Sequence, residues 1–402
     1  MKRFAIITFV AGLTLTSCSS DDVNAPEDND LIIPQNYTFE REGVSTVNYE
    51  GQTTRLEMST EMLSAFTDFD NATATSLSNM FSNLNSPFSS AELNTSSKSI
   101  KSKVAASALY FSSNTVESSE IKNDFETFIT DQMNVVKVNK DQLAEPGLAG
   151  QIAAGSRVRF VNEKGLELNQ AFAKGLIGGL LLDQIVNNYL SVQVLDEGEN
   201  RANNKNEVLE EGSAFTTMEH KWDEAYGYLY GDSSIPTANP NSVLNESEDH
   251  LLFNYLGEVD ADEDFAGLAE GTFDAFKKGR AAIVAEDYLI RDEQVKIIRE
   301  NLSKVIAVRA VNYLQAGKAA LAEQKYGNAF HDLSEGYGFI YSLRFTNNPS
   351  TNMPYISKEQ VNIYKEQLLD GNGFWEVSPE TLDSISEEIA TAFGFTVEEA
   401  AM

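Results

Sequence analysis

Apolar residues recur every three or four positions through most of the chain, which is the spacing that places them on one face of an α-helix. Shorter alternating stretches predict strands at 37–39 and 46–49, with a turn at 50–52, and a second strand pair near 156–160. The helical periodicity predicts helices at 59–69, 119–135, 166–190, 214–230, 265–285, 289–316, 319–342, 358–369 and 379–393. We therefore expect a mainly α fold, a helical bundle with small β-hairpin additions.

The first residues have the composition of an export signal. Two basic residues precede an apolar run at 4–15 that is too short to span a bilayer as a helix. Residues 15–18, Leu-Thr-Ser-Cys, match the lipobox of bacterial lipoproteins, in which a signal peptidase cuts before a cysteine that carries lipid. Cys18 is the only cysteine of the chain, so lipidation also accounts for an otherwise unpaired thiol. The sequence predicts a signal peptide at 1–17 and attachment of Cys18 to the lipid bilayer.

The segment 18–36 is polar and acidic. Such a composition cannot bury apolar surface, so this segment is expected to be a disordered tether. The Ser-Ser-Asp-Asp run directly after Cys18 resembles the surface-export signal of Bacteroidetes lipoproteins. These features predict an outer membrane lipoprotein of the cell envelope that faces either the periplasm or the cell exterior. The remainder, 37–402, is expected to form a single helical domain.

The chain carries 61 acidic and 30 basic residues, which gives a net charge of −31 at pH 7. An acidic surface of this size repels phosphate backbones, so the charge argues against nucleic acid as a partner. After the export signal, no stretch has the length and apolarity of a transmembrane helix. We expect the lipid on Cys18 to be the membrane attachment.

An eleven-residue pattern occurs twice on predicted helices. The first copy, His-Lys-Trp-Asp-Glu-Ala-Tyr-Gly-Tyr-Leu-Tyr, spans 220–230, and the second, His-Asp-Leu-Ser-Glu-Gly-Tyr-Gly-Phe-Ile-Tyr, spans 331–341. An Asn-Tyr-Leu run precedes each copy. The pattern predicts a duplicated helical bundle whose halves, at approximately 165–256 and 286–369, pack about a pseudo-twofold axis.

The repeated His, Glu and Gly share one stripe of their helix, because positions i+4 and i+7 lie within about 40° of position i. Glycine inside a helix costs roughly 1 kcal/mol relative to alanine. Gly227 and Gly338 therefore suggest that another helix or a ligand approaches the backbone closely there. Tyr226 and Tyr337 point away from the stripe and would line the site or pack the core.

A histidine and a carboxylate one helical turn apart can converge on one metal ion, because imidazole nitrogen and carboxylate oxygen are both metal ligands. If the two copies face each other, they make a four-ligand constellation of His220, Glu224, His331 and Glu335. Alternatively, each Glu orients its own His inside a polar cluster that fixes the packing of the halves. The pattern is compatible with both interpretations.

The lipobox, the helical pattern, the duplication and the run from His220 to Asp223 resemble imelysin-like proteins. These are bacterial envelope proteins with two related helical-bundle halves and a Gly-x-His-x-x-Glu motif. Asp223 stands where that motif has Glu, so the resemblance adds it to the candidate ligands, and Met218 replaces the motif's Gly, which weakens the case for hydrolysis. The runs at 162–167, 174–179 and 222–228 look more like a Bacteroidetes lipoprotein family of unknown function, distantly similar to imelysins.

The resemblance implies a lipid-anchored envelope binding protein related to the uptake of iron, another metal or an iron carrier, with envelope uptake partners. Its site would lie at the interface of the two halves, where Tyr226, Tyr337, Gly227 and Gly338 would contact the ligand. One alternative is an envelope metallopeptidase, in which a bound divalent metal or iron activates water and a carboxylate serves as general base. The other alternative is a structural or adhesive surface lipoprotein without catalysis.

Overall fold

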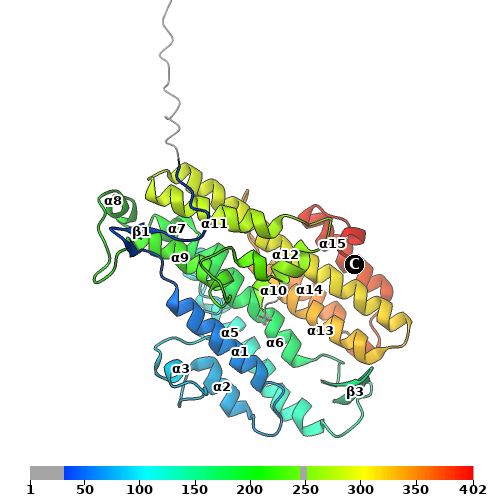
Figure 1. Ribbon diagram of the computed structural model, residues 1–402. Coiled ribbons are helices and arrows are strands. Elements are labelled where there is room, and N and C mark those ends of the chain that lie inside the picture. Colours follow the sequence, from blue (N-terminus) through cyan, green and yellow to red (C-terminus); the bar gives the residue numbers. More distant parts are fainter. Residues whose placement is uncertain (1–30, 245–250, 402) are drawn as a thin grey trace, which may run out of the picture. The chain divides into compact units, whose positions relative to one another are not determined.

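The longest helix, α12 (Tyr288–Ala322), lies against three others: α11 (Leu268–Val284), α13 (Tyr326–Ser342) and α15 (Pro379–Phe393) (Figure 1). The computed structural model describes residues 31–244 and 251–401. In α12, the four successive residues 305–308 are all buried. Four residues complete a full helical turn, so neighbours cover this part of α12 on every side.

The fold is mainly α, as predicted. The helices predicted at 358–369 and 379–393 match α14 (Lys358–Leu368) and α15. The predicted boundary at 316–319 is wrong, because α12 continues to Ala322, and the helix predicted at 59–69 begins earlier. The other α-helices are α1 (Glu50–Ala65), α2 (Ala74–Ser82), α3 (Ala91–Thr95), α4 (Ala108–Phe111), α5 (Thr115–Asp131), α6 (Leu168–Leu176), α7 (Val192–Leu195), α8 (Asn200–Lys205), α9 (Thr217–Tyr230), α10 (Leu252–Asp260) and α16 (Val397–Ala400).

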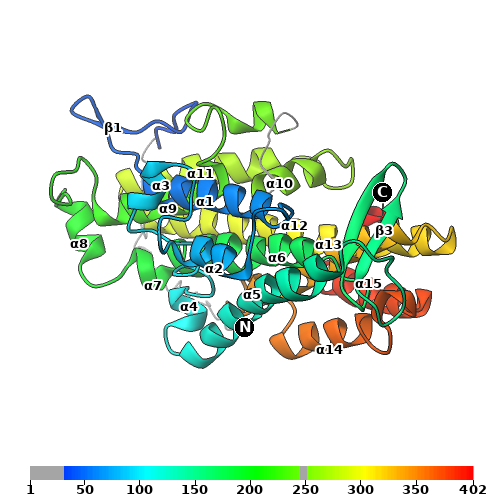
Figure 2. The same cartoon turned by 90° about the horizontal axis from the view of Figure 1, so that it is seen from below.

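Two small antiparallel hairpins accompany the helices. In the first, β1 (Glu40–Arg41) pairs with β2 (Val44–Ser45), so the strands predicted at 37–39 and 46–49 are misplaced, and the predicted turn at 50–52 is the first turn of α1. The alternation at 37–39 reflects side-chain packing instead, since Tyr37 stacks on Tyr226 with ring centroids 3.6 Å apart. The second hairpin, β3 (Gly150–Ala154) with β4 (Arg157–Val161), lies beside α13 (Figure 2).

The helix predicted at 166–190 begins as α6 and continues as a π-helix, η3 (Ile177–Tyr189). All of its residues are buried, and α9 packs against it. Asp183 lies within it at 0% exposure and accepts hydrogen bonds from the backbone N–H groups of Ala106 and Ser107 at 3.1 and 3.0 Å. Among the described residues, no helix is long and apolar enough to cross a membrane.

The described residues from Ile32 onward form one compact unit. The predicted signal peptide at 1–17, the lipidation site Cys18 and most of the predicted tether lie outside the described residues. Their assignments stay predictions from the sequence.

Candidate functional site

The first repeated His–Glu pair lines a pocket between α1, α9 and η3. Helix α9 begins with a capping box, in which Thr216 and Glu219 each bind the other's backbone N–H. This start places His220 and Glu224 in the wall of a pocket of about 340 Å³, which we call the α9 pocket. Tyr189, from η3, lines the same pocket, and its hydroxyl interacts with Glu224.

Glu224 is held as a carboxylate by donors from two helices. Gln52 of α1 donates from Nε2 to Glu224 at 3.0 Å, and Lys221 binds the other carboxylate oxygen at 2.9 Å. Burial alone would raise the pKa of Glu224, but Lys221 and His220 hold it below its usual value. Burial, together with this carboxylate, raises the pKa of Tyr189, so its phenol stays neutral.

The second pair lines a larger pocket of about 1060 Å³, the α13 pocket, which His331 and Glu335 share with Tyr313. Lys174 of α6 binds Glu335 at 3.3 Å, and Tyr313 interacts with the same carboxylate. The ring of His331 lies between two carboxylates, with Nδ1 3.3 Å from Glu167 and Nε2 3.8 Å from Glu335. The two pockets therefore repeat one set of side chains: a tyrosine from the Asn-Tyr-Leu run, a histidine, and a glutamate bound by a donor from a neighbouring helix.

The pockets have no lining residue in common. The four residues of the predicted constellation are thus divided, with His220 and Glu224 in one pocket and His331 and Glu335 in the other. Over 31–244 and 251–401, no group of three or more His, Cys, Asp and Glu residues is placed to hold a metal ion.

The repeated glycines allow helices of the protein itself to approach closely. A Cβ atom on Gly227 would lie 2.3 Å from Cβ of Tyr49 and 3.1 Å from Cβ of Gln52. A Cβ atom on Gly338 would lie 2.5 Å from Cβ of Lys174. The residues that approach each glycine therefore include the one whose side chain binds the glutamate of the same repeat: Gln52 at Gly227 and Lys174 at Gly338.

The repeated tyrosines are interior residues. Tyr226 is fully buried, stacks on Tyr37 and donates its hydroxyl to the carbonyl of Pro236. Tyr337 is buried in α13, where the ammonium group of Lys365 lies 5.8 Å from its ring centroid. Neither tyrosine lines the α9 pocket or the α13 pocket.

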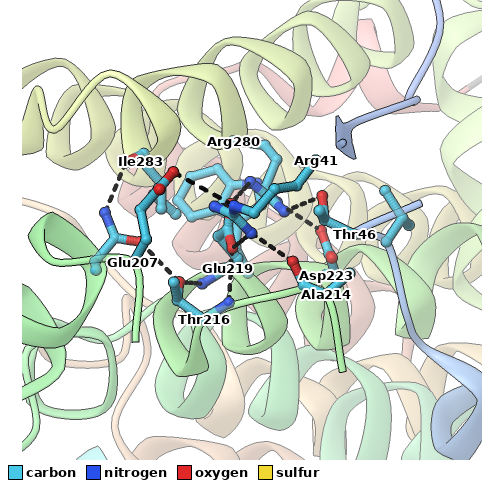
Figure 3. Close-up of polar contacts among 12 residues, drawn as sticks. Arg41, Thr46, Glu207, Ala214, Thr216, Glu219, Asp223, Arg280 and Ile283 are labelled. Atoms are coloured by element: carbon cyan, nitrogen blue, oxygen red, sulfur yellow. Dashed lines mark hydrogen bonds and ion pairs between the residues drawn. The ribbon is translucent and has the colours of Figure 1, made fainter. Parts of the chain in front are cut away.

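Asp223, the candidate ligand added by the resemblance, lies in a buried ion-pair cluster (Figure 3). Arg280 of α11 reaches Asp223 through Nε at 3.1 Å and Glu219 through Nη1 at 3.0 Å, and all three side chains are at most 1% exposed. The hydroxyl of Tyr37 donates to Asp223 at 2.7 Å, and Arg41 binds Glu219 at 3.2 Å. These bonds fix the chain ahead of α1 onto α9 and α11.

Burial raises the pKa of Asp223 to about 6, while Arg280 opposes the shift. For Glu219, Arg280 and Arg41 outweigh burial, so its pKa is lowered. Arg41 also reaches Glu207 at 3.4 Å, so two guanidinium groups meet three carboxylates, and the donors of Arg280 are used within the protein. Asp223 is therefore used in ion pairs within the protein, and it lines neither the α9 pocket nor the α13 pocket.

Sequence patterns did not identify three cations of the α9 pocket: Arg55, Lys98 and Lys103. Arg55 lies on α1, and the two lysines lie in the serine-rich segment between α3 and α4. Positive residues in an acidic chain were a usable signal, but nothing in the sequence indicated that these segments meet the repeated helix. Lys174 of the α13 pocket and Glu167, which lies 3.3 Å from His331, fell within two of the runs that carried the family resemblance, without an assigned role.

Comparison with known proteins finds no match among curated proteins and none among solved structures. A family described as a domain of unknown function, DUF4856, matches residues 34–396, which include both repeats and all residues of the two pockets named above. Since this match covers most of the chain, the protein belongs to the DUF4856 family.

Proposed function

We propose that the protein is a lipid-anchored binding protein of the cell envelope whose ligands occupy the α9 pocket and the α13 pocket. The observation that carries the proposal is the repetition of one Tyr–His–Glu set, each time in the wall of a pocket. Side chains that serve only packing have no need to line a cavity in both copies. A duplicated, imelysin-like pair of halves, each contributing one pocket, is part of this proposal.

The proposed ligand is a molecule held by several side chains, an iron carrier included, rather than a bare metal ion. In the described part of the chain, each repeated His–Glu pair lacks the further ligands that would complete a metal site. The same observation leaves a metallopeptidase without support from the described side chains. Anchoring by Cys18 in the outer membrane, facing the periplasm or the exterior, rests on the sequence of the first residues.

Native mass spectrometry tests the binding function. The full chain, purified in detergent from the cells that make it, is compared with His220→Ala and His331→Ala, each confirmed to be folded by circular dichroism. A small molecule that accompanies the wild type and is lost from one variant supports the proposal. Wild-type protein that carries no molecule and gains none from a cell-envelope extract contradicts it.

The same samples test the anchor. The mass of the N-terminal peptide is expected to show a diacylglycerol group on Cys18, and the protein is expected to partition into the detergent phase. A Cys18→Ala variant is the control and should remain in the aqueous phase. An unmodified cysteine in the wild type would contradict lipid anchoring and leave the binding function to be judged from the pockets alone.

A further inference from the structure

The α9 pocket has a positive wall in a strongly negative protein. Three cations line it, Arg55, Lys98 and Lys103, and none of them forms an ion pair with a described carboxylate. The carboxylates in the wall are Glu50 and Glu224. Glu224 is already bound by Lys221 and Gln52. Since the chain as a whole has a net charge of −31, cations without carboxylate partners are unexpected at this one cavity.

Arg55 is the most constrained of these cations. It is only 5% exposed, and its guanidinium group donates to the backbone carbonyls of Ser99 at 3.1 Å and Gly51 at 3.0 Å. These carbonyls satisfy hydrogen bonds but supply no negative charge. A buried charge without a counter-charge is costly, so an anion in the pocket would complete the environment of Arg55.

Lys103 adds a second cation without a described ion pair to the wall of the α9 pocket. Its ammonium group lies 5.3 Å from the ring centroid of Tyr189, and that of Lys221 lies 5.6 Å from the same centroid. Burial lowers the pKa of Lys103, and although Glu224 opposes this shift, Arg55, Lys221 and Lys98 add to it. The cations therefore repel one another across the pocket, and a bound anion would relieve that repulsion.

The N-terminus of α1 faces the same cavity. Glu50, Gly51 and Gln52 line the pocket, and the residue before them, Tyr49, makes no side-chain cap. The helix dipole favours negative charge at this end, although the N–H group of Gln52 is already bonded to the carbonyl of Tyr49 at 3.0 Å. The histidine of the repeat, His220, also lines the pocket, and its buried Nδ1 has no hydrogen-bond partner among the described residues.

We infer that the α9 pocket binds a small anion with two or more negative charges, carried by carboxylate or phosphoryl groups. This inference rests on the proposed binding function and names its ligand class for one pocket. The volume of about 340 Å³ has room for about ten water molecules, which suits a compact metabolite rather than a polymer. In the α13 pocket, Lys174 is paired with Glu335 and Arg159 with Glu167, and the remaining cation, Arg157, is exposed.

Isothermal titration calorimetry at low salt tests the inference on the full chain in detergent, with citrate, inorganic phosphate and glucose 6-phosphate as probes. Citrate represents the carboxylate source, and the other two represent the phosphoryl source. We expect at least one probe to bind with one site per chain and with an affinity that falls as salt rises. Absence of binding by all three at millimolar concentration overturns the inference.

A pair of matched double variants locates the site. Lys98→Gln with Lys103→Gln removes two pocket charges, whereas Lys296→Gln with Lys304→Gln makes the same charge change on α12, away from this pocket. Each lost charge-assisted hydrogen bond is expected to weaken binding about tenfold, so the pocket variant should lose about 100-fold and the control about twofold or less. Equal losses in both variants, with both folded, overturn the inference.

The inference and the proposed function can fail separately. Glucose and choline serve as neutral and cationic probes of the same size class. Binding of either one that is lost in His220→Ala, without binding of any anion, overturns the anionic class but keeps a binding function for the pocket. Native mass spectrometry tests the binding function independently of these probes, because it detects molecules that accompany the protein from the cell.

Discussion

Gln52 binds Glu224 in the first repeat as Lys174 binds Glu335 in the second. Each side chain comes from a helix that crosses a repeated glycine, and each donates to the glutamate one turn before that glycine. The donor to the glutamate is a neutral amide in one pocket and an ammonium group in the other.

Lys174→Gln should destabilise the protein. The side chains of Lys174 and Glu335 are 6% and 9% exposed, so removal of the ammonium group leaves a buried carboxylate with less compensation. We expect a loss of about 2–4 kcal/mol in the free energy of unfolding, measured by urea denaturation. Lys318→Gln is the control, since its pair with Asp383 is more exposed, and it should cost about 1 kcal/mol or less. Equal losses would contradict a special role for the buried pair.

Gly227→Ala and Gly338→Ala should each be destabilising, because the new Cβ atoms would lie 2.3 and 2.5 Å from neighbouring Cβ atoms. Overpacking of this kind costs about 1–3 kcal/mol. Gly271→Ala, in α11, is the matched control, since its nearest neighbour would be 3.5 Å away, and it should gain about 0.5–1 kcal/mol. The melting temperature should fall in the first two variants and rise in Gly271→Ala. A higher melting temperature in Gly227→Ala would contradict the close approach.

Arg280→Met should destabilise by about 3–5 kcal/mol, because Glu219 and Asp223 would be left buried without their shared cation. The same variant should expose the segment around Tyr37 to limited proteolysis, since Asp223 and Arg280 help to hold that segment. Lys278→Met is a control on the same helix. Unchanged cleavage near Tyr37 in the folded Arg280 variant would show that other contacts hold the segment.

The buried Asp183 predicts a pH dependence of stability. Burial raises the pKa of Asp183 to about 7, with hydrogen bonds to Ser107, Asn187 and Ala106 opposing the shift. Because the folded-state pKa is above the unfolded value near 3.8, this group's contribution is fully present below about pH 4 and is lost as pH rises through 7. Asp183→Asn keeps an acceptor for the two N–H groups and removes this loss.

The comparison of wild type and Asp183→Asn at pH 5 and pH 8 measures that contribution. We expect the variant to gain on the order of 1–3 kcal/mol relative to wild type on going from pH 5 to pH 8. Asp124→Asn, in α5, controls for the general effect of removing an acidic residue. A difference that does not depend on pH would contradict titration of Asp183 in this range.

Local patterns predicted the parts that depend on neighbours in sequence. The spacing of apolar residues located α9 and α13, and the repeat located the His and Glu residues that line the pockets. The partner of Asp223 could not be predicted in this way, because Arg280 is 57 positions away and nothing between them marks the contact. The motif resemblance made Asp223 a candidate ligand, but its burial and its ion pair are properties of the tertiary packing.

The cations of the α9 pocket show the same limit. Lys98 and Lys103 lie in a serine-rich segment that resembles a surface loop in composition, and only the packing of that segment beside α1 brings them to the pocket. The strands at 37–39 and 46–49 were mispredicted because their alternating burial arose largely from contacts with helices, although the N–H of Thr46 does donate to the carbonyl of Phe39 at 2.8 Å.

The cluster around Arg280 also has a mechanical consequence. The chain is bonded to α9 and α11 between Tyr37 and Asn48, before it reaches the first pocket-lining turn of α1. A pulling force applied ahead of Tyr37 would therefore load buried ion pairs and a stacked tyrosine pair first. Those contacts would have to break before such a force reached α1, so they shield the α1 wall of the α9 pocket from tension in the chain before Tyr37.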